Sequence, residues 1–186
     1  MRESAWGLLG MNKTQIGLLV LALASAAPAL AAGDPLAEAR RGLFQCYVQD
    51  AARKTCRAIA HYEFSADGRI RNPALVLVSL QPVTIMAVTS QVEVKADAVC
   101  GIARAEDIDS ASIAAAGQQL SPDQTRAIKT QIKAAMAARI GKEICTTYLP
   151  EGDHYAAQVT VDGTPAPELS AQIYWVGPND GYTVAP

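Results

Sequence analysis

Residues 56–80 read CRAIAHYEFSADGRIRNPALVLVSL and predict a β-hairpin. Over residues 57–64 apolar side chains mostly alternate with polar ones, the period of a half-buried strand. Asp67-Gly68 then supplies a turn, because this pair accepts a positive φ at low cost. Ile70–Leu80 forms the second strand, with an LVLV centre that is apolar on both faces. We therefore expect these two segments to begin an antiparallel sheet.

Further strands are expected on both sides of the middle of the chain. They are Val83–Val88, Val92–Cys100, Tyr155–Val161 and Gln172–Val176, with a turn at Asp162-Gly163. The apolar residues of the segment 92–100 share one parity, so Cys100 is expected to point toward the core. The same reasoning on the first strand points Cys56 toward the core.

Two helices are predicted. Asp34–Gly42 resembles a short helix with Pro35 at its first position, and we expect it to pack loosely. The longer helix begins at Ser121, which can form a capping box with Gln124. It runs through Ile140 and bends or ends near Gly141. Its apolar stripe recurs every four residues and consists of Ile128, Ile132, Met136 and Ile140.

Four cysteines lie downstream of residue 31, at Cys46, Cys56, Cys100 and Cys145. An even number in an exported chain predicts two disulfides, for which three connectivities exist. We favour Cys46 with Cys56 and Cys100 with Cys145, because nearby cysteines close first and the other two then pair. A Cys100–Cys145 bridge would attach the end of the long helix to the sheet. The spacings do not match a zinc site, since no CxxC pair occurs.

Residues 1–31 have the layout of a signal peptide, with Lys13 before an apolar stretch and a cleavage site after Ala31. A translational start at Met11 fits this layout better than one at Met1. The apolar stretch is shorter than the roughly 20 residues that span a bilayer, so no anchor is expected after cleavage. General secretion to the periplasm or the extracellular space is the expected route.

Residues 32–186 are expected to form a single domain, since their number suits one core. Strands with one long helix between them predict an α+β fold. In this arrangement, an antiparallel sheet of about five or six strands packs against the long helix, and two disulfides stabilise the domain.

Several classes of function are disfavoured by composition and motifs. The net charge is −2, which argues against a nucleic-acid partner. The chain has no GxGxxG or GxxxxGK phosphate-binding motif, so no nucleotide cofactor is expected. It has no GxSxG nucleophile motif either. His61 and His154 have acidic neighbours in sequence, but polar strand and loop surfaces explain them better than acid–base catalysis.

Two sets of residues are candidates for binding. Tyrosine and tryptophan favour wet interfaces, and five of them gather in the last third of the chain. They are Tyr148, Tyr155, Tyr174, Trp175 and Tyr182. A cationic face on the long helix is the second candidate, formed by Arg126, Lys129 and Lys133 with Arg139 and Lys142 beyond them. Core margins and a solvated helix face are the commoner explanations for such sets.

The sequence also resembles a group of uncharacterised exported proteins of alphaproteobacteria that contain four cysteines. The resemblance rests on KTCRAIA at 54–60, VCG at 99–101, IGKEIC at 140–145 and the ending DGYTVAP at 180–186. It implies an envelope location and brings no activity, ligand or site residue with it.

Taken together, these features predict an exported, non-catalytic binding or inhibitor-type domain without a cofactor or metal. Its partner would be an envelope protein, a glycan or a lipid. One alternative is an envelope structural or assembly protein that contacts anionic lipid or protein through the basic helix. The other is a hydrolase without a recognisable motif that uses His61 or His154.

Overall fold

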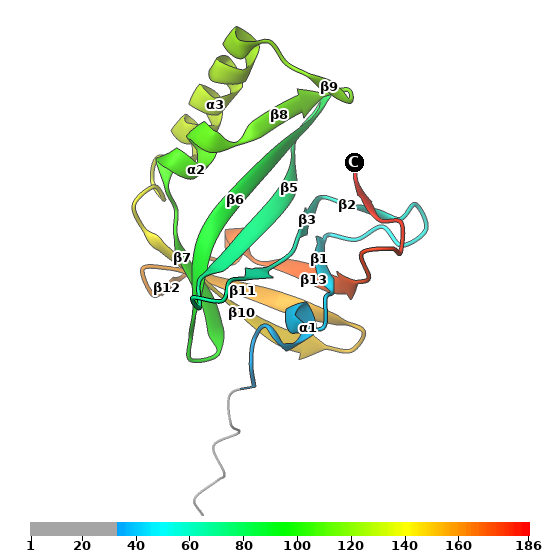
Figure 1. The fold of residues 1–186 in the computed structure, drawn as a ribbon, viewed down its shortest axis with the longest axis vertical. Helices are drawn as coiled ribbons and strands as arrows, with labels where there is room; N and C mark the ends of the chain where they lie inside the picture. Colours follow the sequence, from blue (N-terminus) through cyan, green and yellow to red (C-terminus); the bar gives the residue numbers. More distant parts are fainter. Residues whose placement is uncertain (1–32) are drawn as a thin grey trace, which may run out of the picture. The chain divides into compact units, whose positions relative to one another are not determined.

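The computed structural model describes residues 33–186, which form a mostly β structure (Figure 1). Eight antiparallel strands form a closed barrel in the order β5-β3-β1-β13-β11-β10-β7-β6, and β6 pairs back to β5. These strands are β1 (Phe44–Tyr47), β3 (Ala58–Ala60), β5 (Ile70–Leu80), β6 (Val83–Lys95), β7 (Ala98–Ile102), β10 (Glu143–Glu151), β11 (His154–Val161) and β13 (Ala171–Val176). The expected α+β fold, with an open sheet packed on one long helix, is therefore wrong.

Short elements complete the described part of the chain. The additional strands are β2 (Thr55–Cys56), β4 (Glu63–Phe64), β8 (Ser112–Ala115), β9 (Gln118–Gln119), β12 (Thr164–Pro165) and β14 (Thr183–Val184). The helices are α1 (Ala37–Arg40), α2 (Ala105–Ser110) and α3 (Pro122–Met136), with a 3-10 turn η1 at Pro167–Leu169. None of these helices is both long and apolar enough to cross a membrane.

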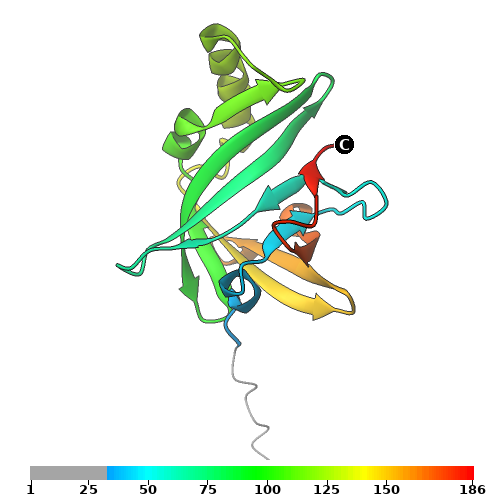
Figure 2. The same cartoon turned by 45° about the vertical axis from the view of Figure 1, so that its right-hand side comes forward.

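The long β5–β6 ribbon explains why the sheet closes. Its two strands pair with each other from Ile70↔Val92 to Leu80↔Val83. The outer edge of β5 also pairs with β3, and the outer edge of β6 pairs with β7 near one end and β8 near the other. The ribbon thus joins both ends of the barrel sheet, and beyond the barrel it continues beside β8 and α3 (Figure 2). Closure removes the exposed strand edges that an open sheet would present.

The predicted hairpin is present, with β5 at the predicted bounds and β3 and β4 pairing with it. The two predicted strands Val83–Val88 and Val92–Cys100 are wrong, because β6 runs without a break through Lys95. The chain reverses at 96–97 instead, where Ala96 has a φ of +54°. Cys100 therefore belongs to the next strand, β7.

The long helix begins as predicted, since the hydroxyl of Ser121 accepts a hydrogen bond from the backbone N–H of Gln124 and the reciprocal bond is also present. It ends at Met136 and covers no broad sheet. Instead, Ile128 and Ile132 pack against a small cluster that includes Met86 of β6. The α3 helix therefore covers the part of the ribbon that projects past the barrel.

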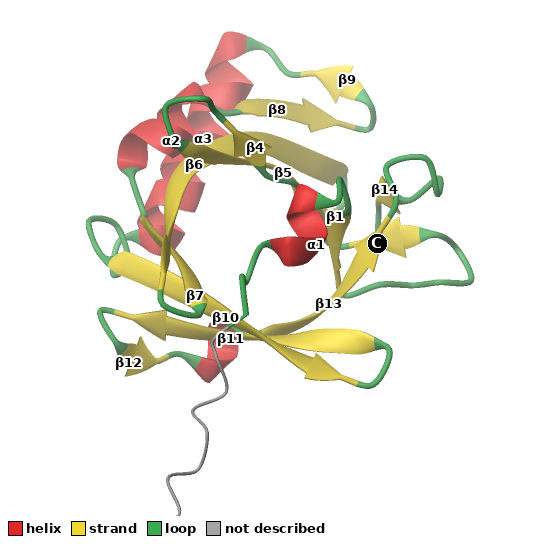
Figure 3. Cartoon of the chain, turned by 60° about the horizontal axis from the view of Figure 1, so that its bottom comes forward, coloured by secondary structure: helices red, strands yellow, loops and turns green. Residues whose placement is uncertain are grey.

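The short first helix closes one end of the barrel, contrary to the expected loose packing. Leu36 and Ala39 are buried against Val99, with the aromatic rings of Tyr148 and Trp175 packed around them. The carboxylate of Asp34 accepts a hydrogen bond from the backbone N–H of Leu36 at 2.9 Å, which fixes the start of this turn. Figure 3 looks into the barrel and shows α1 within the ring of strands.

Both favoured disulfides are confirmed. Cys46 is bonded to Cys56, Cys100 is bonded to Cys145, and no cysteine is free. The expected attachment of the helix end to the sheet is wrong, because Cys145 lies opposite Cys100 on the neighbouring strand β10. Disulfides persist in oxidising surroundings, so the bonds indicate an oxidising compartment. The predicted signal peptide lies outside the described residues.

Candidate ligand-binding cavity

A cavity of about 260 Å³ lies inside the barrel. Alternate residues of a strand face the same side of a sheet, and the cavity is lined by such alternate residues. On β6 they are Met86, Val88, Ser90 and Val92, and on β10 they are Ile144, Thr146 and Tyr148. Most of the lining is apolar, so the cavity is a small hydrophobic pocket with a few polar side chains.

Tyrosine hydroxyls form the main polar group of this chamber. The hydroxyl oxygens of Tyr62 and Tyr148 lie 2.8 Å apart, within hydrogen-bond distance. The hydroxyl of Tyr47 donates to the side-chain oxygen of Gln45 at 3.2 Å. All three tyrosines line the cavity. We call Gln45, Tyr47, Tyr62 and Tyr148 the tyrosine cluster.

The buried tyrosines of the cluster stay neutral. Burial is the largest cause that raises the pKa of Tyr47 and Tyr62 well above the usual value near 10, and the neighbouring Tyr148 raises both further. A tyrosine with a raised pKa keeps its proton at neutral pH and can donate a hydrogen bond. Tyr47 and Tyr62 therefore carry uncharged hydroxyl groups.

Two buried nitrogen atoms, one in the tyrosine cluster and one in Trp175, have no hydrogen-bond partner among residues 33–186. Gln45 is fully buried, and its amide nitrogen has no hydrogen-bond partner among residues 33–186. The indole nitrogen of Trp175 also has no partner among these residues, and Trp175 lies opposite Gln45 in the β1–β13 pair. Buried polar groups normally find partners, so these two nitrogens are unsatisfied donors near the tyrosine hydroxyls.

The end of the cavity away from α1 is lined by α2 and the last residue of α3. Arg104, just before α2, is exposed, and Asp107 is half-buried. Neither side chain has an ion-pair partner within residues 33–186. Because Tyr62 and Tyr148 pack against the α1 end, the charged residues and the tyrosine cluster lie toward opposite ends of the chamber.

The five aromatic residues singled out in the sequence do not form one surface. Tyr148 and Tyr155 make edge contacts with Trp175 at centroid distances of 6.2 and 6.5 Å, and Trp175 packs in the barrel core. Tyr174 and Tyr182 pack instead against the Cys46–Cys56 disulfide. Neighbouring strand residues face opposite sides, which explains the separation of 174 from 175.

Sequence analysis missed Gln45, Tyr47 and Tyr62 as members of a site. A signal for two of them was present, because Gln45 and Tyr47 flank a disulfide cysteine in FQCY and so share the opposite face of β1. The sequence pattern did not identify the partner strand β13, whose residues lie more than 100 positions away from β1.

The cations of the predicted basic face have partners nearby. Arg126 pairs with Asp123 at 2.9 Å and Lys133 with Asp109 at 2.6 Å, while Lys129 donates to the Asp109 backbone carbonyl at 2.7 Å. Beyond the helix, Arg139 lies near Glu168 and Lys142 near Asp162. The face therefore combines cations with their own counter-charges.

The two histidines lie apart from the cavity lining. The ring of His61 stacks on Phe44 at 4.8 Å, and its Nε2 atom is 3.7 Å from a Glu63 oxygen. His154 bonds to the carboxylate of Asp153 at 3.0 Å and lies against the ring of Tyr174. In the part of the chain that the structure describes, neither histidine is hydrogen-bonded to a hydroxyl or a thiol.

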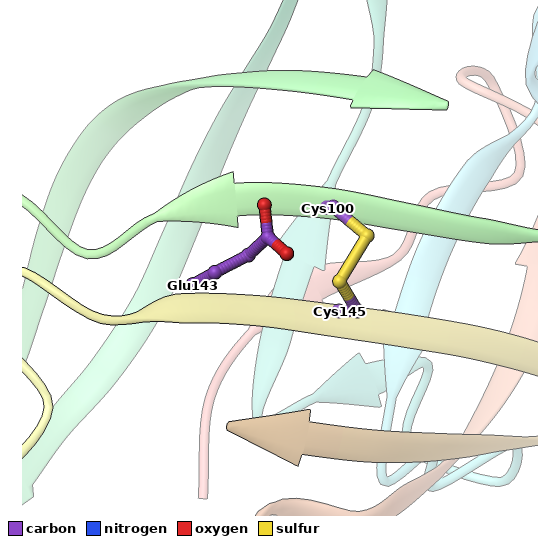
Figure 4. Close-up of side chains that lie close together, drawn as sticks. All are labelled: Cys100, Glu143 and Cys145. Carbon is purple, nitrogen blue, oxygen red and sulfur yellow. A yellow bond between two sulfur atoms is a disulfide. The ribbon is translucent and has the colours of Figure 1, made fainter. Parts of the chain in front are cut away.

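One group of side chains has the spacing of metal ligands, namely Cys100, Glu143 and Cys145 (Figure 4). Its two sulfur atoms are joined in a disulfide. Metal binding by cysteine needs thiolates, so the bonded sulfurs are not available as ligands. The Glu143 carboxylate pairs instead with Lys95.

Comparison of the chain with protein-family models, with curated proteins and with solved structures found no match.

Proposed function

We propose that this protein is a non-catalytic binding protein that holds one small, mostly apolar molecule inside its barrel. The observation that carries the proposal is the cavity of about 260 Å³ within the closed barrel. Eight-stranded barrels are just wide enough to be filled by side chains or to hold one small ligand. Ligand pockets are typically concave, mostly apolar and equipped with a few polar groups, as this chamber is.

The size of the chamber bounds the ligand. At roughly 30 Å³ per water molecule, the space corresponds to on the order of eight waters. A ligand of this size is a small ring or short chain, and a folded lipid with two tails would not fit. Val88, Val92, Val99 and Ile144 would contact its apolar body.

The proposed place of action is the periplasm or the extracellular space. Two disulfides support an oxidising compartment. The expected signal peptide at residues 1–31 and the resemblance to exported alphaproteobacterial proteins are in keeping with export. A small apolar molecule that enters or leaves a cell crosses this compartment.

Toluene is a suitable first probe, because it is apolar and small enough for the chamber. We expect toluene to shift the backbone amide NMR signals of cavity-lining residues in a saturable manner. Ser90→Leu should abolish these shifts, since residue 90 lines the cavity and leucine would fill it. Gln91→Leu is the matched control, because Gln91 is exposed on the same strand.

The proposal is wrong if toluene leaves the cavity signals of the folded protein unchanged at millimolar concentration. It is also wrong if Ser90→Leu and Gln91→Leu bind toluene equally well, because the probe would then lie outside the barrel.

A further inference from the structure

We propose that the ligand carries a neutral hydrogen-bond acceptor, such as a ketone, ester or amide carbonyl, and that the tyrosine cluster binds this oxygen. This inference rests on the proposed function and specifies the chemistry of the same cavity. The ligand would enter with its carbonyl toward the α1 end and its apolar body toward α2.

The first argument is the balance of donors and acceptors around the cluster. In the hydrogen bond between Tyr62 and Tyr148, one hydroxyl donates and the other accepts. The hydroxyl that accepts still has its own hydrogen, which it can donate to a further acceptor. The amide nitrogen of Gln45 and the indole nitrogen of Trp175 also have no partner in residues 33–186, although neither residue lines the cavity. A ligand oxygen that accepts would use the free tyrosine hydrogen.

The second argument concerns charge. Burying a carboxylate without a cation is costly, and the tyrosine cluster contains no cationic side chain. Arg104, the cation on the cavity lining, is exposed and lies toward the other end. Asp107 lines the same end and would oppose an anionic head group there. A neutral carbonyl fits the interior of this cavity better than an anion does.

The third argument is the shape of the remaining surface. Between the tyrosine hydroxyls and α2, most of the lining is apolar and includes Val88, Ile108, Met136 and Ile144, with Ser90 and Thr146 as polar positions. A molecule with one polar atom at its inner end and a mostly hydrocarbon body would match both regions.

Three probes of nearly equal size test this inference. Acetophenone has a carbonyl, α-methylstyrene replaces that oxygen by a methylene group, and benzoate carries a charge. One hydrogen bond contributes about 0.5 to 1.5 kcal/mol, which corresponds to a roughly two- to twelve-fold tighter binding of acetophenone than of α-methylstyrene. Affinities would be measured by NMR titration of the oxidised protein as it is purified after export.

Tyr148→Phe and Tyr62→Phe should each reduce the ratio of the two affinities toward one. Because both probes are measured on the same variant, a general loss of stability does not change this ratio. Tyr155→Phe is the matched control, since Tyr155 contacts Trp175 but does not line the cavity.

Equal affinities of wild type for acetophenone and α-methylstyrene would overturn the inference while leaving the apolar binding site intact. Tightest binding of benzoate, lost in Arg104→Gln, would also overturn it, because the site would then recognise an anion at its mouth. Failure of all three probes and of toluene would instead overturn the proposed function itself.

Discussion

Replacing Leu36 by alanine should lower the free energy of unfolding by about 2.5 to 5 kcal/mol. Leu36 has an exposed fraction of 0% and belongs to the core cluster that closes one end of the barrel. The substitution removes three carbon atoms, and at about 0.8 kcal/mol per buried methylene the lost transfer energy alone is about 2.4 kcal/mol. The remainder comes from the void left between Val99, Tyr148 and Trp175, whose strand backbones cannot collapse into it.

The measurement is a urea unfolding curve of the oxidised protein, followed by circular dichroism and by tryptophan emission. With a slope of about 1 to 3 kcal/mol per molar urea, a loss of 3 kcal/mol lowers the midpoint by about 1 to 3 M. The slope itself should stay unchanged, because the variant exposes nearly the same surface on unfolding. Leu80→Ala is the matched control, since Leu80 is 51% exposed and its truncation should cost less than about 0.5 kcal/mol.

If Leu36→Ala and Leu80→Ala unfold at the same urea concentration, α1 does not close the barrel. The loose packing expected from the sequence would then be the better description of this turn.

Three further outcomes follow from the fold. Cys100→Ala/Cys145→Ala should lower stability by up to about 4 kcal/mol in the chain-entropy model, since 45 positions separate the two cysteines; urea curves that coincide with wild type would contradict this. Gly101→Ala should lower the free energy of unfolding, measured by thermal unfolding, by about 1 to 3 kcal/mol, because an added Cβ would lie 2.9 Å from a backbone carbonyl oxygen of β6. Gly33→Ala serves as the control, since a Cβ at residue 33 meets nothing within 4 Å. Burial raises the pKa of Tyr62 in the folded protein above the value of about 10 that a tyrosine has in the unfolded chain. The neutral Tyr62 side chain therefore contributes fully to stability below about pH 10. Above this pH, the free energy of unfolding should fall by up to about 1.4 kcal/mol per pH unit. Tyr62→Phe should accordingly flatten the alkaline fall of the unfolding free energy, and an equally steep fall would refute this reading.

Local features of the fold could be predicted from the sequence because they depend on neighbouring residues. The capping box at Ser121 follows from a hydroxyl three residues before a glutamine. The strand Ile70–Leu80 follows from an apolar run bounded by a turn and a proline. The disulfide pairing followed from sequence distance, and the register Cys100↔Cys145 now gives it a geometric reason.

Closure of the barrel could not be predicted in the same way. It depends on pairings such as Phe44↔Val176, which join segments more than 100 residues apart and leave no local pattern. The helix Pro122–Met136 also covers a smaller surface than the predicted sheet. An apolar stripe shows that a helix packs on something, but it does not show how large that surface is. Here that surface is a small cluster around Met86.

The candidate cavity was missed because its polar members look like ordinary strand residues. Tyr62 lies within the alternating segment 57–64, which predicts a half-buried strand, and Gln45 lies in the short strand Phe44–Tyr47. Only the closed barrel brings these two side chains together with Tyr148. Of the five aromatic residues predicted as a binding surface, Tyr148 lines the cavity, and Trp175 packs in the core cluster beside it.

The positions of the disulfides fit a barrel whose interior is kept open. Gly101 and Val99 line the cavity, so the side chain of Cys100 between them lies on the face of β7 away from the cavity, where it is buried with an exposed fraction of 1%. The expected direction of Cys100 toward the core therefore holds for its burial but not for the barrel interior. Ile144 and Thr146 place Cys145 on the face away from the cavity in the same way. The two bridges contribute about 3 and 4 kcal/mol to stability by the loop-entropy estimate. Crosslinks on the outer face can thus stabilise the barrel without occupying the space that a ligand needs.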